Sequence, residues 1–311
     1  MKFFSSLLRR RSALRGAQVS ALAYCLLGYA IWACADAIAK LVSSADAPKY
    51  QLLAIVAFGG IVSVGMAILA QGKIKLMRPR NPAGLIALSL FSVCTGVGIV
   101  VALSHIPFVQ YYVIGFMSPM VIALLAAIFM GERLDGPKIF AIVVGFIGVV
   151  VAVNPYELLK GHGNLIGIFA TVCVVMSFSV QMLLLRVLGR KDSRESLALW
   201  PRISSLFIYL AFGVFAGFSP MAWPVVLLAF AWGFVGGFGW LAMAEASQRA
   251  PAAVLAPCQY SQILYGAAFG YFVWHETLSW YLALGSVIIM GAGVYMFRHA
   301  CKLDAIAGAQ A

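Results

Sequence analysis

The sequence has 311 residues, of which 63% are hydrophobic and only 10% are charged. A soluble domain carries about 25% charged residues, so this composition excludes a chain whose surface faces mainly water. The formal charge of +12 would favour nucleic acid as the partner of a soluble protein. In a membrane protein the same charge sets the orientation of the chain, so we expect the lipid bilayer, and no nucleic acid, as a partner.

Ten long apolar runs follow one another along the chain, separated by turn residues such as Asn81-Pro82 and Gly136-Pro137. A helix of about 20 apolar residues crosses the roughly 30 Å hydrocarbon core of a bilayer, whereas the strands of a membrane barrel alternate apolar and polar residues. The runs cover 17–43, 50–71, 83–104, 109–130, 137–154, 164–188, 197–217, 224–246, 252–273 and 278–298. The sequence therefore predicts an all-α integral membrane protein with ten transmembrane helices.

The basic residues predict the orientation of these helices. All of the 22 lysines and arginines except Lys40, Lys49, Lys160 and Arg202 lie in the two tails or in every second loop. Because cytoplasmic loops are enriched in Lys and Arg, both termini are expected in the cytoplasm. A competing interpretation is that residues 9–35 form a cleaved signal peptide. We favour a first transmembrane helix, since the internal repeat requires it.

The second half of the chain resembles the first at an offset of about 144 residues. Pro107 and Glu132 correspond to Pro251 and Glu276, with a spacing of 25 residues in both halves. Five helices per copy is an odd number, so the copies enter the membrane from opposite sides, as in many secondary transporters. The expected organisation is a basic tail over 1–16, a five-helix repeat over 17–154, a linker over 155–163, an inverted five-helix repeat over 164–298, and a tail over 299–311.

Three features resemble the EamA-type transporters of the drug/metabolite transporter superfamily. They are the GERL motif at 131–134, the spacing from Trp32 to Lys40, and the glycine-rich helices GFIGVVVAV and GAGVYMFR that end the two halves. The resemblance implies ten helices and a central cavity lined by helices 1, 3, 4, 6, 8 and 9, through which small metabolites pass. Many relatives carry an arginine early in the second helix, where this chain reads YQLLAIVAFGG.

Polar residues inside the first run provide the first candidates for a binding site. Trp32, Asp36 and Lys40 are four residues apart and so lie on one face of a helix. Because a carboxylate at membrane depth usually faces a cavity or a partner, Asp36 is expected to contact a cationic amino group or to exchange a proton. Lys40 is expected to pair with Asp36 or to extend toward the headgroups.

Other candidates come from the remaining helices. Pro119 is expected to kink the fourth helix, beside the aromatic candidates Tyr112 and Phe116. The predicted substrate-binding residues are Trp32, Asp36, Tyr112, Phe116, Gln181, Trp240, Gln259, Tyr260 and Gln262. Hydrogen bonding between helices is the competing interpretation for Gln259, Tyr260 and Gln262. Glu132 and Glu276 are interpreted as helix caps, and Arg202 as an anchor at the membrane interface.

The sequence contains no P-loop lysine motif and no metal-ligand spacing. We therefore do not expect an ATP-driven pump or an enzyme, and we expect no cofactor. The sequence predicts a secondary transporter of the bacterial inner membrane that moves a small-molecule solute by alternating access. The expected solute is an amino acid or a related amine-bearing compound, with protons as the candidate coupling ion. Export is the direction that the family resemblance suggests. A lipid flippase of the same fold and an integral-membrane enzyme acting on lipid phosphate are the alternatives, and both monomer and dimer are compatible with the sequence.

Overall fold

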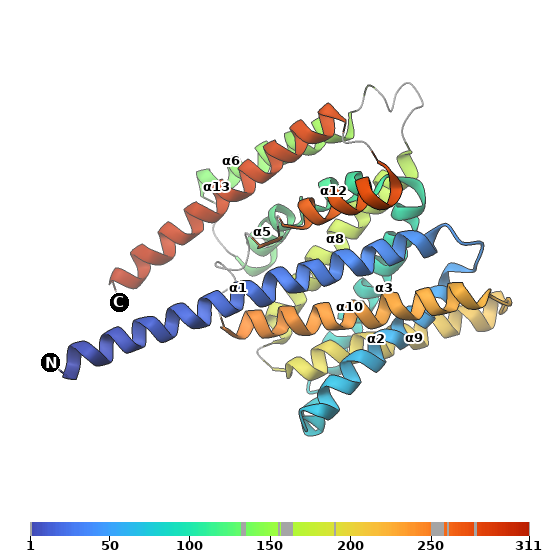
Figure 1. Ribbon diagram of the computed structural model, residues 1–311, viewed down its shortest axis with the longest axis horizontal. Helices are drawn as coiled ribbons and strands as arrows, with labels where there is room; N and C mark the ends of the chain where they lie inside the picture. The colour runs from blue at the N-terminus through green and yellow to red at the C-terminus, as the bar shows by residue number, and fades with distance from the viewer. Residues whose placement is uncertain are drawn as a thin grey trace.

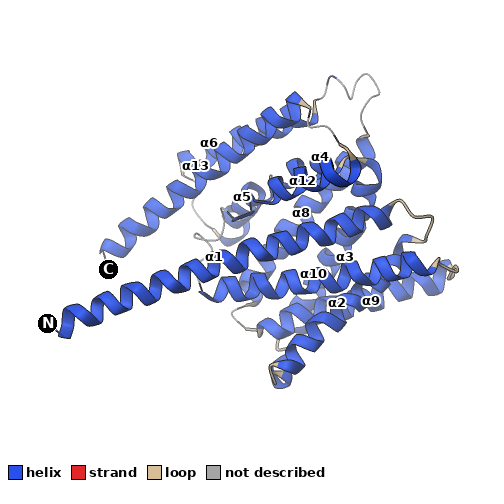
Figure 2. Cartoon of the chain, in the orientation of Figure 1, coloured by secondary structure: helices blue, strands red, loops and turns tan. Residues whose placement is uncertain are grey.

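The protein is described by a computed structural model that covers residues 2–131, 135–154, 156, 164–189, 191–249, 258–259, 261–276 and 279–310. Within these ranges every regular element is helical (Figure 2). The helices are α1 (Lys2–Ser43), α2 (Lys49–Ala70), the 3₁₀ helix η1 (Ile74–Met77), α3 (Pro82–His105), α4 (Phe108–Gly115), α5 (Ser118–Met130), α6 (Gly136–Val153), α8 (Leu165–Leu188), α9 (Arg194–Ala216), α10 (Trp223–Arg249), α12 (Ser261–Trp274) and α13 (Trp280–Gln310).

Eight helical segments among the described residues are long and apolar enough to cross a bilayer. They correspond to the first eight predicted runs, with α4 and α5 together forming the fourth. A shorter apolar helix, Trp280–Tyr295, lies in the tenth predicted run, and α12 occupies part of the ninth. The prediction of an all-helical membrane protein is confirmed, and the total of ten spans stays a prediction. The basic tail at 2–16 continues α1 as helix.

Polar side chains begin several of these helices by capping backbone N–H groups that have no partner inside the helix. The Asn81 side chain accepts from Gly84 N at 3.1 Å, and Asn164 accepts from Gly167 N at 3.2 Å. Ser193 accepts from Ser196 N at 3.1 Å and so fixes the start of α9 at Arg194. The start of α9 matters for the site, because it sets how deep the following residues lie.

Under the repeat, the first-half helices α1, α2, α3 and α6 correspond to α8, α9, α10 and α13 of the second half. Helices α1 and α3 each pack against the counterpart of the other. α1 of the first half lies against α10 of the second, and α8 of the second half lies against α3 of the first. In addition, α2 packs on α9 and α6 packs on α13, which pairs corresponding helices with each other (Figure 1). This exchange pattern is the one expected of two similar five-helix units related by a two-fold axis.

The direction of the paired helices supports the inversion of the second unit. Along α6 and α13, the Phe140 ring lies 5.8 Å from that of Tyr295, whereas a Cβ atom on Gly148, two turns later in α6, would meet Ile289. Residue numbers therefore rise along α6 as they fall along α13, so these corresponding helices are antiparallel. The same antiparallel relation is visible in Figure 1, where α13 runs back toward the end at which α6 begins.

The fourth predicted helix is broken into α4 and α5 at residues 116–117. Pro119 has no backbone N–H, which leaves the carbonyl of Gly115 without its helical partner. The Ser118 hydroxyl donates to that carbonyl at 2.6 Å and so satisfies it locally. The predicted kink is confirmed, and a serine beside the proline allows the break to be buried.

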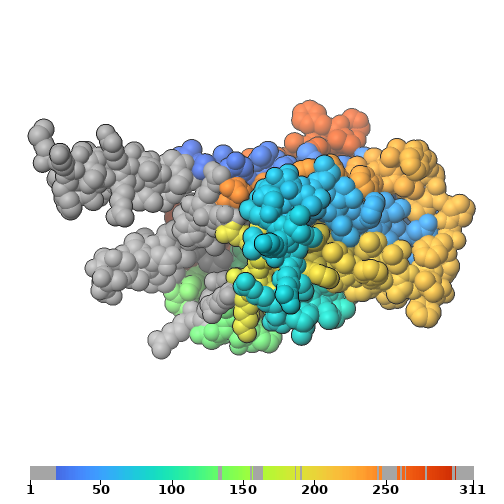
Figure 3. Space-filling view, turned by 90° about the horizontal axis from the view of Figure 1, so that it is seen from below, coloured from blue at the N-terminus to red at the C-terminus, as the bar shows by residue number. Residues whose placement is uncertain are grey.

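The outer surface of the bundle is apolar. On α9, for example, Phe212 and Phe215 are 59% and 90% exposed, while Tyr209 and Ser205 of the same helix are buried. The space-filling view in Figure 3 shows α9 and α2 on the face seen from below, where they pack side by side. α9 thus has one face suited to lipid and an opposite, more polar face directed into the protein.

Candidate functional site

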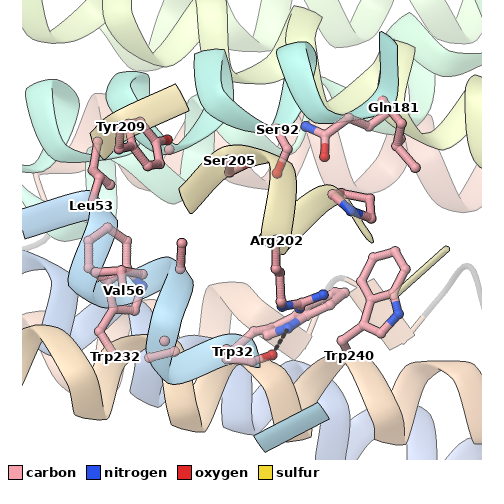
Figure 4. Close-up of a pocket in the computed structure, with 18 of the residues that line it drawn as sticks. Trp32, Leu53, Val56, Ser92, Gln181, Arg202, Ser205, Tyr209, Trp232 and Trp240 are labelled. Carbon is pink, nitrogen blue, oxygen red and sulfur yellow. Dashed lines mark hydrogen bonds between the residues drawn. The ribbon is translucent and has the colours of Figure 1, made fainter. Parts of the chain in front are cut away.

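A cavity of about 260 Å³ lies between the two halves, lined by residues of α1, α2, α3, α8, α9 and α10 (Figure 4). Its described wall combines apolar and aromatic side chains with a few polar groups. The lining residues are Trp32, Ala35, Asp36, Leu53, Val56, Ala57, Gly60, Leu88, Ser92, Gly96, Gln181, Leu185, Leu197, Pro201, Arg202, Ser205, Tyr209, Trp232, Gly233, Gly236 and Trp240. A mostly apolar cavity with a few convergent polar groups is typical of a small-molecule site.

Trp32 forms part of the wall between α1 and α10, as predicted for its position. Its indole N–H donates to the carbonyl of Gly236 at 3.2 Å (Figure 4), and its ring lies 6.4 Å from the ring of Trp240. A Cβ atom on Gly239 would come within 2.4 Å of the indole. Glycine at position 239 is therefore what lets the Trp32 ring lie flat against α10.

Asp36 lies on the cavity wall one helical turn after Trp32, and Tyr112 of α4 stands behind it. The Tyr112 hydroxyl donates to Asp36 Oδ2 at 2.8 Å. The Tyr112 ring is buried against α12, where a Cβ atom on Gly266 would come within 2.6 Å of it. Tyr112 therefore holds the carboxylate in place, although it is not itself among the residues that line the cavity.

The expected pairing of Lys40 with Asp36 is wrong. Lys40 instead forms an ion pair with Glu276, which lies between α12 and α13. The Lys40 ammonium also lies 4.8 Å from the Trp274 ring centroid and 5.8 Å from that of Phe108. Its side chain is only 13% exposed, so it does not extend to the headgroups. Glu276, which is distant in sequence, thus pairs with Lys40 in place of Asp36 of the same helix.

Gln181 lines the cavity from α8 and links this helix to α3. Its amide nitrogen donates to the Thr95 hydroxyl at 2.6 Å and to the Phe91 carbonyl at 3.2 Å. In Figure 4 its side chain lies near that of Ser92, another lining residue. The residue thus lies on the cavity wall and also forms a helix-to-helix hydrogen bond, and its predicted contact with a substrate stays a prediction.

Trp240 separates the cavity from a second, smaller pocket of about 70 Å³. It lines both spaces. The second pocket contains Lys73, Arg194 and Glu195 and lies at the end of the bundle where the basic loops gather, which we term the basic end. Trp240 is therefore shared by the walls of the central cavity and of a pocket at the basic end.

Several predicted site residues are placed elsewhere by the structure. Phe116 is 2% exposed and packs into the core at the break between α4 and α5. Gln259 lies just before α12 and Gln262 lies in its first turn, and neither is among the residues that line the cavity. Tyr260 lies outside the described residues, as does Glu132. The substrate-binding roles of these residues stay predictions.

Arg202 is the main residue that the sequence interpretation misplaced. It was expected at the membrane interface, but it lines the central cavity. The predicted seventh run starts at 197, whereas α9 starts at Arg194, so Arg202 lies more than two turns inside the helix. The serine that caps α9, Ser193, is the sequence signal that could have revealed this depth.

The helices around the cavity also differ from the expected set. Helices 4 and 9 were expected on the wall, but within the described residues α4, α5 and α12 contribute no lining residue. α2 and α9 line the cavity instead. The reason is close packing: a Cβ atom on Gly233 of α10 would lie 1.8 Å from the Val56 carbonyl of α2, so these backbones touch and hold α2 against the cavity.

The chain belongs to the EamA-like transporter family, whose model matches residues 19–154 and again residues 165–298. It is thus a multi-pass membrane protein of a transporter family of the drug/metabolite transporter superfamily. The two matches cover the two halves that the helix pairings relate.

Three curated relatives show the range of this similarity. The chain is 23% identical to the pseudopaline exporter CntI of Pseudomonas aeruginosa, over 75% of this chain and 78% of the relative. It is 24% identical to the transporter YvbV of Bacillus subtilis over 75% and 76%. It is 25% identical to the S-adenosylmethionine uptake transporter of Rickettsia prowazekii over 59% and 61%.

A solved crystal structure has the same fold. It superposes with a TM-score of 0.62 and covers 93% of this chain and 99% of its own length, at 18% sequence identity. At this identity the likeness concerns the fold alone.

Proposed function

We propose that the protein is a secondary-active transporter that moves a small amphipathic metabolite through the central cavity by alternating access. The observation that carries the proposal is the cavity itself, which lies between the two halves and has Trp32, Asp36, Gln181 and Trp240 on its wall. Asp36 would contact an ammonium group of the solute, and the tryptophans would supply apolar surface. Phe116, Gln259, Tyr260 and Gln262 remain candidates for contacts made in another conformation.

The volume of the cavity supports a small solute. About 260 Å³ is near the lower end of the range for small-molecule pockets and far below what a lipid with two acyl chains requires. An amino acid or a related amine-bearing compound fits this space, and we propose such a solute rather than a whole lipid. The relatives include one named as an exporter and others named as uptake transporters; we propose export, with the chain in the bacterial inner membrane and both termini in the cytoplasm.

The two ends of the cavity support alternating access. At the end opposite the basic loops, the ion pair of Lys40 and Glu276 joins the two halves. At the basic end, Trp240 stands between the cavity and the neighbouring pocket. We propose these two features as the barriers that open in turn, since a passage open at both ends would be a channel.

The proposal is tested by reconstituting the purified protein in liposomes. Uptake of a panel of labelled amino acids and nucleosides is measured with and without a pH gradient. We expect accumulation of at least one amine-bearing solute above protein-free liposomes, and stimulation by the gradient if protons are the coupling ion. Transport of none of these solutes, or scrambling of labelled lipid by the same liposomes, would overturn the proposal.

A further inference from the structure

Arg202 carries a positive charge into the cavity with few partners of its own. Among the described residues its guanidinium donates to the carbonyl of Ala198, one turn earlier in α9, and lies 5.7 Å from the Trp240 ring centroid. No carboxylate in the described part of the chain forms an ion pair with it. A guanidinium has five N–H donors, so most of them remain available on the cavity side.

The opposing helix leaves space for this side chain. A Cβ atom on Gly60 of α2 would lie 2.8 Å from Nε of Arg202. Glycine at this position therefore gives the guanidinium room beside α2, in the wall of the cavity, rather than forcing it toward the basic end. Figure 4 shows Arg202 extending toward Trp32 across the cavity region.

Ser205 provides a second polar group on the same face of α9. It is three residues after Arg202, so the two side chains are neighbours on the helix surface, and both line the cavity. The Ser205 hydroxyl is buried and has no hydrogen-bond partner among the described residues. Because buried polar groups are nearly always hydrogen-bonded, an unsatisfied hydroxyl beside an unpaired guanidinium indicates a missing acceptor.

We propose that Arg202 and Ser205 form a carboxylate-binding site within the cavity, so that the transported solute is a zwitterion. This inference rests on the proposed function. A carboxylate is the acceptor that fits a guanidinium in a bidentate manner, with Ser205 donating a further hydrogen bond. Asp36 of α1, which does not pair with Arg202, is the cavity charge available for the ammonium group. The two charges of the cavity thus match the two charges of an amino acid.

This assignment narrows the solute class. A simple amine would leave Arg202 buried and uncompensated, and a simple carboxylic acid would leave Asp36 in the same state. Burying a charge without a partner is costly, so both compounds should be poor substrates compared with a zwitterion. The separation of the two charged groups in the preferred solute should follow the width of the cavity between α1 and α9.

The test uses the full-length protein in proteoliposomes and amino acids whose amino and carboxyl groups are separated by one to five carbon atoms. For the compound transported fastest, uptake is compared with that of its methyl ester and of the amine lacking the carboxyl group. We expect both to be transported at least tenfold more slowly by the unmodified protein. Arg202→Gln should reduce uptake of the amino acid roughly 10- to 100-fold, the cost of a charge-assisted hydrogen bond, and should remove its advantage over the ester.

Two further variants keep the result interpretable. Ser205→Ala removes one oxygen atom from the buried wall and is expected to reduce uptake of the amino acid about threefold, with little effect on the ester. It decides the case if Arg202→Gln fails to fold. Arg78→Gln is the matched control, because Arg78 is exposed in the loop after η1, and its uptake should equal that of the unmodified protein.

The outcomes separate this inference from the proposed function. If the unmodified protein transports the ester and the amine as fast as the amino acid, the carboxylate site is wrong while amine transport stands. The site is equally wrong if Arg202→Gln and Ser205→Ala leave the discrimination unchanged. If no compound in the panel is transported, the proposed function fails and this inference fails with it.

Discussion

Glu276 joins the two halves of the protein by binding Lys40 and the start of α4 at the same time. Its carboxylate pairs with the Lys40 ammonium and accepts hydrogen bonds from the backbone N–H groups of Phe108, at 3.0 Å, and Val109, at 3.2 Å. A carboxylate at a helix N-terminus is stabilised by the unpaired N–H groups and by the helix dipole. Glu276 was expected to cap the helix that follows it, but it caps α4 of the other half of the chain instead.

Replacing Glu276 by glutamine should therefore destabilise the protein more than loss of an exposed ion pair. The side chains of Lys40 and Glu276 are 13% and 15% exposed, and breaking a buried pair costs about 3 kcal/mol because one charge is left uncompensated. We expect a clear fall in the melting temperature of the protein in detergent, measured by tryptophan fluorescence. The double variant with Lys40→Met should recover part of this loss, since it removes the stranded charge.

The matched control for this prediction is Glu195→Gln. The side chain of Glu195 is 16% exposed, close to the value for Glu276, but its partner Lys73, 3.6 Å away, is 42% exposed. An ion pair that is open to solvent on one side contributes less than about 1 kcal/mol. Its melting temperature should stay close to that of the unmodified protein. Equal effects of the two glutamine substitutions would contradict the role given to Glu276.

Tyr112→Phe should weaken transport without removing the charge of Asp36. The substitution deletes the hydroxyl that donates to Asp36 at 2.8 Å, which lets the carboxylate move relative to the cavity. We expect a loss of roughly tenfold in uptake of the transported amine-bearing solute, matching a hydrogen bond to a charged group. Asp36→Asn should cause a greater loss, and Asp46→Asn, at an exposed position in the loop after α1, should cause none. Full activity of both Tyr112→Phe and Asp36→Asn would show that the carboxylate does not contact the solute.

Much of the fold follows from local patterns in the sequence. The apolar run predicted at 50–71 is the helix Lys49–Ala70, and the run at 83–104 is Pro82–His105. Helix length, turn residues and capping are properties of neighbouring residues, so the sequence contains enough information for them. The repeat adds long-range information because it relates positions about 144 residues apart.

The site could be predicted only in part, because its geometry depends on which helices touch. Trp32, Asp36, Gln181 and Trp240 were found as polar or aromatic residues inside apolar helices. Lys40 was paired incorrectly because its partner comes from the other half of the chain. The cavity-lining role of α2 depends on glycines that allow two backbones to meet, and the sequence does not show which neighbour a glycine faces.

The contact between α2 and α10 predicts a strong effect of one methyl group. A Cβ atom on Gly233 would lie 1.8 Å from the Val56 carbonyl and 3.0 Å from Gly60 N, both backbone atoms that cannot rotate away. Gly233→Ala should therefore force the helices apart, lower the melting temperature and abolish uptake. Gly65→Ala in α2 is the matched control, because a Cβ atom there would meet no atom within 4 Å and Gly65 does not line the cavity. If Gly233→Ala is tolerated as well as Gly65→Ala, the close packing of α2 and α10 is wrong.

Trp240→Ala should open the central cavity toward the basic end, since Trp240 alone among the lining residues of the two pockets borders both. The reporter is Ser92→Cys, a cavity position (Figure 4), in a variant whose six native cysteines are replaced. A charged, membrane-impermeant thiol reagent is added to inside-out vesicles, in which the basic end faces the medium if the termini are cytoplasmic as proposed. We expect modification to become severalfold faster when Trp240 is replaced. Trp280→Ala, which removes a ring that is 75% exposed on the outside of the bundle, should leave the rate unchanged. Equal rates in the Trp240 variant and its parent would mean that another group closes the cavity at this end. Removing the Trp240 ring would then enlarge the cavity without connecting it to the medium.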